Sequence, residues 1–248
     1  LESWGAAIVA PINEELYKGA GLVAIYLMAK REIDGVMDGL VYGAMIGLGF
    51  QVVENVQYFL QAASLGGGNG LDAVVGMYFV RVVLAGIYSH TLFSGLMGFG
   101  FAWAVTRRDA SRRRRWFVAG MFAALAWAAH FVWNSPWLDT MMSRGGASFV
   151  SAIAIKGLPF VFFLIILGGF ARRRERKAFD RLIAAEVGTD VLTGTEFRIL
   201  VKARKRRAAL RGIKKQKGRR SRAILKQLQR EQMNLALFHG RVGASEHP

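Results

Sequence analysis

Five long apolar segments fill most of the first 170 residues and restrict the chain to folds that suit a membrane. They cover residues 4–29, 35–63, 86–106, 116–137 and 149–170. A helix needs about 20 mostly apolar residues to cross the hydrocarbon core of a bilayer, and a helix satisfies its backbone hydrogen bonds without water. Hydrophobic residues make up 53% of the chain, a composition that fits a protein embedded in a lipid bilayer. We therefore expect an all-α fold, a polytopic transmembrane helix bundle with five spans.

The expected topology rests on one short segment and on the positions of the positive charges. Residues 71–85 follow a glycine-rich turn at 66–70 and are too few for a span, so we expect a re-entrant or interfacial helix there. Basic clusters lie at 30–31, 107–115 and 172–174. Five spans from an external N-terminus place all three clusters in the cytoplasm, whereas a sixth span at 71–85 would break that agreement.

Positive charge is concentrated in the tail and marks a domain boundary. Residues 1–170 hold 12 Lys/Arg and 10 Asp/Glu, whereas residues 171–248 hold 22 and 7. We therefore expect a membrane domain over 1–171 and a basic, partly helical cytoplasmic tail over 172–248, with helices near 195–210 and 222–238. Anionic lipid headgroups are the expected partner of the tail. Nucleic acid is not an expected partner, because the tail has few aromatic side chains that could stack on bases: Phe179, Phe197 and Phe238.

Four of the apolar segments contain ionisable or carboxamide side chains at membrane depth. Such groups cost about 2.5–3.5 kcal/mol each in a bilayer and mark functional sites by default. Four separate helices with this feature predict one shared polar site in the outer half of the membrane. The chain has no cysteine, so a metal there would need imidazole, carboxylate or amide ligands. The residues are Glu14, Glu15 and Lys18, then Glu54 and Asn55, then His90, then His130 and Asn134.

Helical spacing places several of these groups on common faces. Glu14 and Glu15 lie four and three residues before Lys18, and His130 lies four residues before Asn134. Lys18 can hold one glutamate ionised, which leaves the second carboxylate either beside a metal or available for general acid–base chemistry. Small residues predict close helix packing elsewhere in these segments. They are Gly43, Gly47 and Gly49, and Gly95, Gly98 and Gly100.

Four motifs in order resemble one protein family. The pattern EExxK occupies 14–18, FxxxEN occupies 50–55, His90 precedes a glycine-rich helix, and HxxxN occupies 130–134. Together they resemble the PrsW family of bacterial intramembrane proteases, which is related to the CAAX prenyl endopeptidases. The resemblance covers residues 8–170 and leaves out the tail. It implies a multi-pass protein of the bacterial plasma membrane that hydrolyses a peptide bond of a single-pass substrate, such as an anti-sigma factor.

Two versions of this chemistry remain open from the sequence. In the first, Glu54, His90 and His130 bind a catalytic Zn²⁺, since such zinc ions have three protein ligands and an open position. Glu14 or Glu15 would then act as general base, and Asn134 would donate to the oxyanion. In the second version no metal is used: a glutamate polarises water directly with help from His90, and His130 and Asn134 form the oxyanion hole.

Two other classes of protein compete with a protease. Buried glutamate and histidine side chains also form the proton relay of a transporter or channel, but the internal repeat typical of transporters is absent from these segments. An inactive membrane scaffold would not need to keep all of these costly groups in lipid. Lys156, in the last apolar segment, is interpreted as a snorkelling or cavity-facing lysine.

Overall fold

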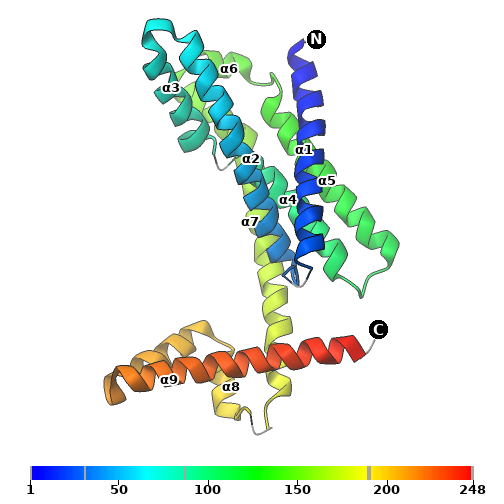
Figure 1. The fold of residues 1–248 in the computed structure, drawn as a ribbon, viewed down its shortest axis with the longest axis vertical. Helices are drawn as coiled ribbons and strands as arrows, with labels where there is room; N and C mark the ends of the chain where they lie inside the picture. Colours follow the sequence, from blue (N-terminus) through cyan, green and yellow to red (C-terminus); the bar gives the residue numbers. More distant parts are fainter. Residues whose placement is uncertain (1, 31, 87, 189–190, 247–248) are drawn as a thin grey trace. The chain divides into compact units, whose positions relative to one another are not determined.

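The computed structural model describes residues 2–30, 32–86, 88–188 and 191–246. This part of the chain is helical and contains no β-strand, which confirms the all-α class. The chain divides into two compact units, Leu1–Ala171 and Arg172–Pro248. Figure 1 shows the helices of the first unit gathered into a bundle.

Long helices form the first unit and follow the apolar segments of the sequence. Three of them are long and apolar enough to cross a membrane: α2, α5 and α7. The helix α1 carries three charged side chains near its middle and α4 has 17 residues, so neither belongs to that group. The five-span topology therefore stays a prediction. The bounds are α1 Glu2–Met28, α2 Val36–Leu65, α4 His90–Thr106, α5 Arg112–Asn134 and α7 Gly146–Ala185, with a short α6 at Asp139–Ser143.

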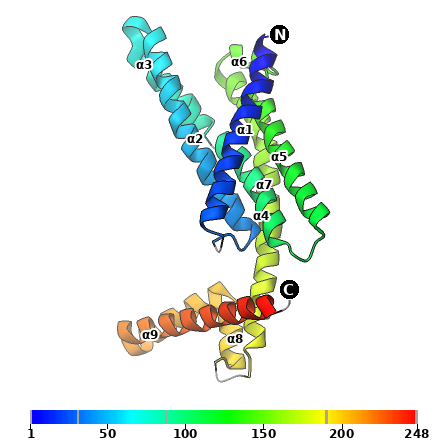
Figure 2. The ribbon, with the colours of Figure 1, turned by 45° about the vertical axis from the view of Figure 1, so that its right-hand side comes forward.

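The segment predicted to be re-entrant folds back along α2 as a helical hairpin. After the 3₁₀ turn η1 (Gly67–Asn69), it forms α3 (Gly70–Tyr78) and then the π-helix η2 (Phe79–Leu84). Gly67 has φ +53°, a conformation that favours glycine at this reversal. Figures 1 and 2 both show α3 beside the end of α2. The next helix begins only at His90, four residues later than the sequence predicted.

Glycines allow α2 and α4 to pack backbone against backbone. A Cβ added at Gly43 would lie 2.1 Å from the carbonyl oxygen of Ser94, and one at Gly98 would lie 2.0 Å from that of Gly39. Gly47 approaches the backbone of His90 in the same way. The predicted close packing is therefore found at these glycines and at Gly100, which meets Phe122 on α5. Gly49 instead faces open space, and Gly95 makes ordinary contacts.

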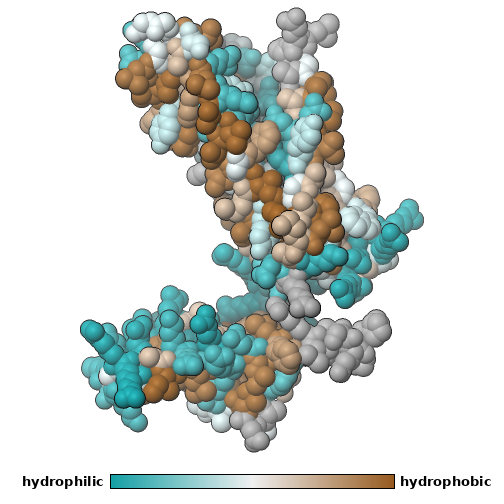
Figure 3. Space-filling model, viewed as in Figure 1, coloured by the Kyte–Doolittle hydropathy of each residue, from teal (hydrophilic) through white to brown (hydrophobic). Residues whose placement is uncertain are grey.

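Two apolar clusters hold α4, α5 and α7 together. One is centred on Phe93, Leu96 and Ala126, and the other on Phe99 and Phe122. Many large apolar side chains remain on the outside of this unit, as the brown patches in Figure 3 show. An apolar exterior around a helical bundle suits contact with lipid.

The second unit has a small apolar core of its own. The helices α8 (Gly194–Leu200) and α9 (Ala203–Glu246) pack with the end of α7 around Ile183, Leu192 and Leu200. The stretch predicted to be helical at 195–210 is divided between α8 and the start of α9, with a break at residues 201–202. Gly218, with φ +83° and ψ −173°, divides α9 into two arms. The segment 222–238 is helical as predicted and lies in the second arm.

Candidate intramembrane active site

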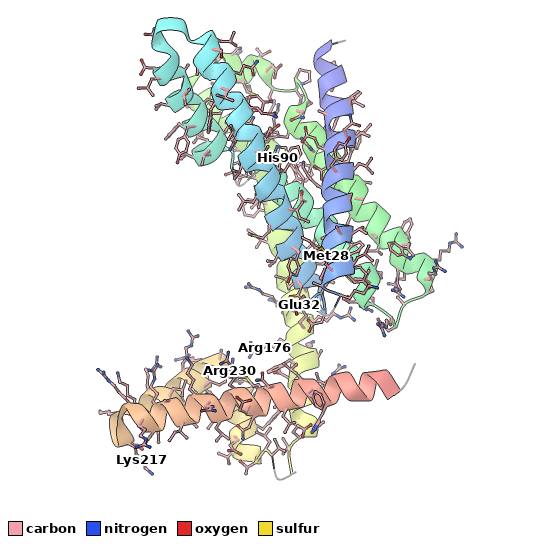
Figure 4. All side chains as sticks on the ribbon, in the orientation of Figure 1. Met28, Glu32, His90, Arg176, Lys217 and Arg230 are labelled. Atoms are coloured by element: carbon pink, nitrogen blue, oxygen red, sulfur yellow. The ribbon has the colours of Figure 1, made fainter. Side chains whose placement is uncertain are left out.

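The structure brings the polar residues of four helices together. Glu14, Glu15 and Lys18 come from the middle of α1, and Glu54 comes from α2. His90 is the first residue of α4, and His130 lies on the last turns of α5. Figure 4 shows His90 among side chains of the bundle. The convergence of these groups inside an apolar bundle is the arrangement that the costs of burial led us to expect.

Lys18 lies at the centre of this cluster and is 2% exposed. Its Nζ donates to Glu15 Oε1 at 2.8 Å and to Glu14 Oε2 at 3.3 Å, and it lies 2.8 Å from His90 Nδ1. The ammonium also sits 4.3 Å from the ring centre of Phe50, a cation–π contact. The first and second motifs of the sequence therefore meet at Lys18.

Each of the two imidazoles contacts a carboxylate through one nitrogen. His130 Nδ1 lies 2.9 Å from Glu15 Oε1, and His90 Nε2 lies 2.8 Å from Glu54 Oε2. The other nitrogens, His90 Nδ1 and His130 Nε2, lie 3.6 and 3.8 Å from Glu14 Oε2. The two rings are perpendicular, with centres 5.0 Å apart. This leaves one carboxylate oxygen and two imidazole nitrogens facing one another.

Glu14, His90 and His130 have the donor chemistry and spacing of a metal site. One possible ligand atom from each lies within 4.8 Å of the other two. Tetrahedral zinc with bonds of about 2.1 Å separates its ligand atoms by about 3.4 Å, close to the distances from Glu14 to each imidazole. Glu15 and Glu54 would then be the outer carboxylates that orient ligating histidines. Glu15 Oε2 is buried and has no hydrogen-bond partner among the described residues.

Glu54, the carboxylate ligand expected from the sequence, has a different set of neighbours. Its Oε2 is shared by His90 and by the guanidinium of Arg81, whose Nη2 is 2.5 Å away. Lys18 affects metal binding at this site, because its ammonium contacts His90 Nδ1, the nitrogen that faces Glu14. A cation held by Glu14 and both imidazoles therefore requires Lys18 to release that hydrogen bond.

A cavity of about 360 Å³ opens beside the cluster. Glu14, Glu54, His90 and Asn134 all line it, whereas Glu15 and Lys18 lie behind them. Asn134 is the last residue of α5, one turn after His130, as the spacing predicted. Segments from α1, α2, η2, α4, α5, α6 and α7 form the walls. The cavity thus gives two carboxylates, an imidazole and a carboxamide access to the same space.

Arg81 and Gln51 belong to the site, although we did not predict them. Arg81 contacts Glu54 and Asn55, and Gln51 accepts a hydrogen bond from Ser89 Oγ at 3.0 Å, next to His90. The signal for Arg81 was a single cation in an apolar segment, and that for Gln51 was its place inside the FxxxEN pattern. Lys156 is buried and caps α5 by donating to the carbonyl oxygens of Trp133 and Ser135.

Fold and site define an integral membrane protein of the all-helical class, with a carboxylate–imidazole centre inside its bundle. Residues 1–168 match the family model described as PrsW family intramembrane metalloprotease, and the chain belongs to this family. A search of curated proteins found protease PrsW of Geobacillus kaustophilus (strain HTA426), 32% identical over 141 residues. That match covers 57% of this chain and 54% of the relative, so it spans about half the relative's length. No solved structure matches the chain.

Proposed function

We propose that the chain is an intramembrane endopeptidase that hydrolyses a peptide bond of a single-pass membrane protein. The observation that carries this proposal is the cavity-lining set of Glu14, Glu54, His90 and Asn134 inside an apolar bundle. Peptide hydrolysis needs an oriented water, a proton acceptor and donors for the oxyanion. Membership of the PrsW family supports the same reaction. An anti-sigma factor is the proposed substrate, and the bacterial plasma membrane the proposed location.

The proposed metal site consists of Glu14, His90 and His130. A zinc ion bound there would supply Lewis-acid chemistry, polarising the scissile carbonyl and making water more acidic. The donor set fits zinc, because the two imidazoles are each held by a carboxylate through the opposite nitrogen. Glu15 has the role of fixing the ring of His130, and Lys18 balances the negative charge of the α1 glutamates.

Glu54 is the proposed proton acceptor. Its Oε2 is engaged by Arg81 and His90, but its Oε1 has no hydrogen-bond partner in the described part of the chain. The residue lines the cavity, so Oε1 can take a proton from water and return it to the leaving amine. Asn134 lines the same cavity, and its amide NH₂ is the proposed donor to the oxyanion.

The test combines cleavage with metal content in reconstituted vesicles. The substrate probe is a single-pass anti-sigma factor labelled at both ends, and zinc is measured by mass spectrometry on the purified chain. Glu14→Gln should lose both zinc and cleavage, whereas Glu54→Gln should lose cleavage and keep most of its zinc. Zinc lost only in Glu54→Gln would restore the ligand set expected from the sequence. Cleavage by a zinc-free wild type would support direct activation of water, and no cleavage of any single-pass substrate would reject the protease.

The basic tail is proposed to lie in the cytoplasm and to bind anionic lipid headgroups. Residues 202–230 hold 14 Lys/Arg and no Asp/Glu, and Ile224 and Leu228 are exposed one turn apart in the same stretch. Cations beside exposed apolar side chains suit a membrane surface. Hydrogen exchange of α9 in the full chain should slow in vesicles that contain phosphatidylserine compared with neutral vesicles. Equal exchange in both would reject lipid binding.

A further inference from the structure

Arg81 stands far from other charged residues along the sequence of the membrane unit. It is the only Lys, Arg, Asp or Glu between Asp72 and Arg107, and it lies in the π-helix η2. An arginine placed among apolar residues in a bilayer is costly unless it has partners, and π-helical turns occur often at functional sites. The contacts of Arg81 therefore indicate its role in the protein.

The side-chain partners of Arg81 among the described residues lie on one face of α2. Its Nη2 bonds Glu54 Oε2 at 2.5 Å, its Nε donates to Asn55 Oδ1 at 2.7 Å, and its guanidinium lies 3.7 Å from the ring centre of Tyr58. The backbone carbonyl of Arg81 accepts from Gln51 Nε2 at 3.5 Å. A single side chain thus contacts both polar residues of the FxxxEN motif and the aromatic ring one turn later.

The planar guanidinium suits this pair of acceptors. It presents several N–H donors in a rigid fork, so it can bond a carboxylate and an amide oxygen at once, whereas a lysine ammonium acts as a point charge. Bonds between an ionised donor and an ionised acceptor are also stronger than neutral ones. Arg81 therefore holds Glu54 and Asn55 together through one rigid group.

Glu54 holds one side of the His90 ring, at Nε2, while Lys18 contacts the other nitrogen, Nδ1. The same oxygen, Oε2, contacts Arg81 and His90 Nε2, so the three side chains form a continuous chain of contacts from η2 through α2 to α4. With Oε2 held at both sides, Glu54 cannot rotate without breaking one of these contacts. The opposite nitrogen of His90 is the one that faces Glu14.

We propose that Arg81 is a positioning residue: it holds Glu54, and through Glu54 it sets the ring orientation of His90. The inference rests on the proposed protease function for its kinetic consequence, but its structural consequence can be measured without activity. Arg81→Met should change the ¹⁵N resonances of His90 in the metal-free full chain in detergent. It should also lower kcat about 10²-fold, the usual cost of misplacing a catalytic group by about 1 Å, with little change in KM.

Three further variants make the test specific. Arg144→Met removes an exposed arginine of the same unit and should match wild type in both measurements. Arg81→Lys keeps the charge but not the fork, so its kcat and His90 resonances should fall between those of wild type and Arg81→Met. In a Glu54→Gln background, Arg81→Met should add no further change at His90, because the proposed route runs through Glu54.

Each outcome separates this inference from the proposed function. If wild type does not cleave, the protease proposal fails and the His90 resonances alone decide the role of Arg81. If wild type cleaves and Arg81→Met matches it in kcat and in the His90 resonances, Arg81 is not a positioning residue. Should Arg81→Met fail to fold, Arg81→Lys decides the question, since wild-type behaviour of that variant would overturn the proposal.

Discussion

Replacing Gly47 with alanine should displace His90 and lower activity. A Cβ built on Gly47 lies 2.1 Å from the carbonyl oxygen of His90, about 1.3 Å short of the 3.4 Å at which ordinary contact begins. The obstructing atom is backbone, so no side chain can rotate away to relieve the overlap. Gly49 lies two residues further along α2, and a Cβ added there would meet open space, so Gly49→Ala provides a matched control.

The magnitude follows from the overlap. Overpacking of a tight interface costs about 1–3 kcal/mol, and alanine recovers up to about 1 kcal/mol of helix propensity relative to glycine. With the full gain in propensity subtracted, we expect Gly47→Ala to lower the free energy of unfolding by up to about 2 kcal/mol. A shift of about 1 Å at His90 should lower kcat about 10²-fold. Gly49→Ala gains the same propensity without the overlap, so it should be neutral or slightly stabilising.

The assay is cleavage of the labelled single-pass substrate, with unfolding by SDS in mixed micelles measured in parallel. Gly47→Ala should lose both activity and resistance to SDS, and Gly49→Ala should lose neither. Wild-type kcat together with wild-type SDS resistance in Gly47→Ala would refute the argument that backbone packing of α2 against α4 positions His90. Equal losses in both variants would show that the effect comes from helix propensity or lipid contact instead.

Three other substitutions test separate parts of the structure. Lys156→Met should raise hydrogen exchange at the end of α5 and lower the free energy of unfolding by about 1–3 kcal/mol, because buried carbonyl oxygens lose their donor. Unchanged exchange would contradict the capping role. Thr193→Ala should destabilise α8 by about 1 kcal/mol, since Thr193 caps that helix and its N–H and hydroxyl hold the pKa of Glu196 below its usual value. A lowered folded pKa stabilises at neutral pH and loses its effect as the pH falls through it, so the difference in hydrogen exchange between the wild-type and alanine forms should become smaller in acid. The part that comes from the hydrogen bond of the Glu196 backbone N–H to Thr193 Oγ1 should remain. Gly218→Ala should speed hydrogen exchange in both arms of α9, because Gly218 adopts a φ/ψ conformation that is essentially limited to glycine and alanine would be strained there. Gly212→Ala should not have this effect.

Much of the fold followed from hydrophobic patterning. Each of the five apolar segments contains a long helix in the structure, and the segment at 71–85 lies back beside α2, whereas its re-entrant place in a membrane stays a prediction. Errors arose where local geometry rather than composition controls the chain. The helix expected from residue 86 starts at His90, after the π-helix η2, and the helix expected over 195–210 is broken between α8 and α9. Apolar content does not distinguish an α-helical turn from a π-helical one, so the sequence carried little signal for the first of these.

The composition of the site was also readable, but its internal pairing was not. The expected carboxylates, imidazoles and Asn134 do surround one cavity or lie directly behind it. Their roles depend on contacts between helices that are far apart in sequence, such as Glu15 with His130 and Glu54 with His90. Helical spacing reports only which groups share a face of one helix. It could not show that Glu14, rather than Glu54, faces both imidazoles.

The sequence by itself determined that the protein suits a lipid bilayer, that its fold is helical, which family it resembles and which polar side chains form the site. These properties depend on which residues are present and on periodicity within one helix. Only the tertiary structure decided which carboxylate meets which imidazole and that Arg81 holds Glu54. It also decided how near α2 comes to α4. The physical reason is that hydrogen bonds and ion pairs fall off within a few ångströms, so they depend on the rotation and depth of whole helices. Those two quantities are set by side-chain packing across the bundle, above all where Gly43 and Gly98 let two backbones touch.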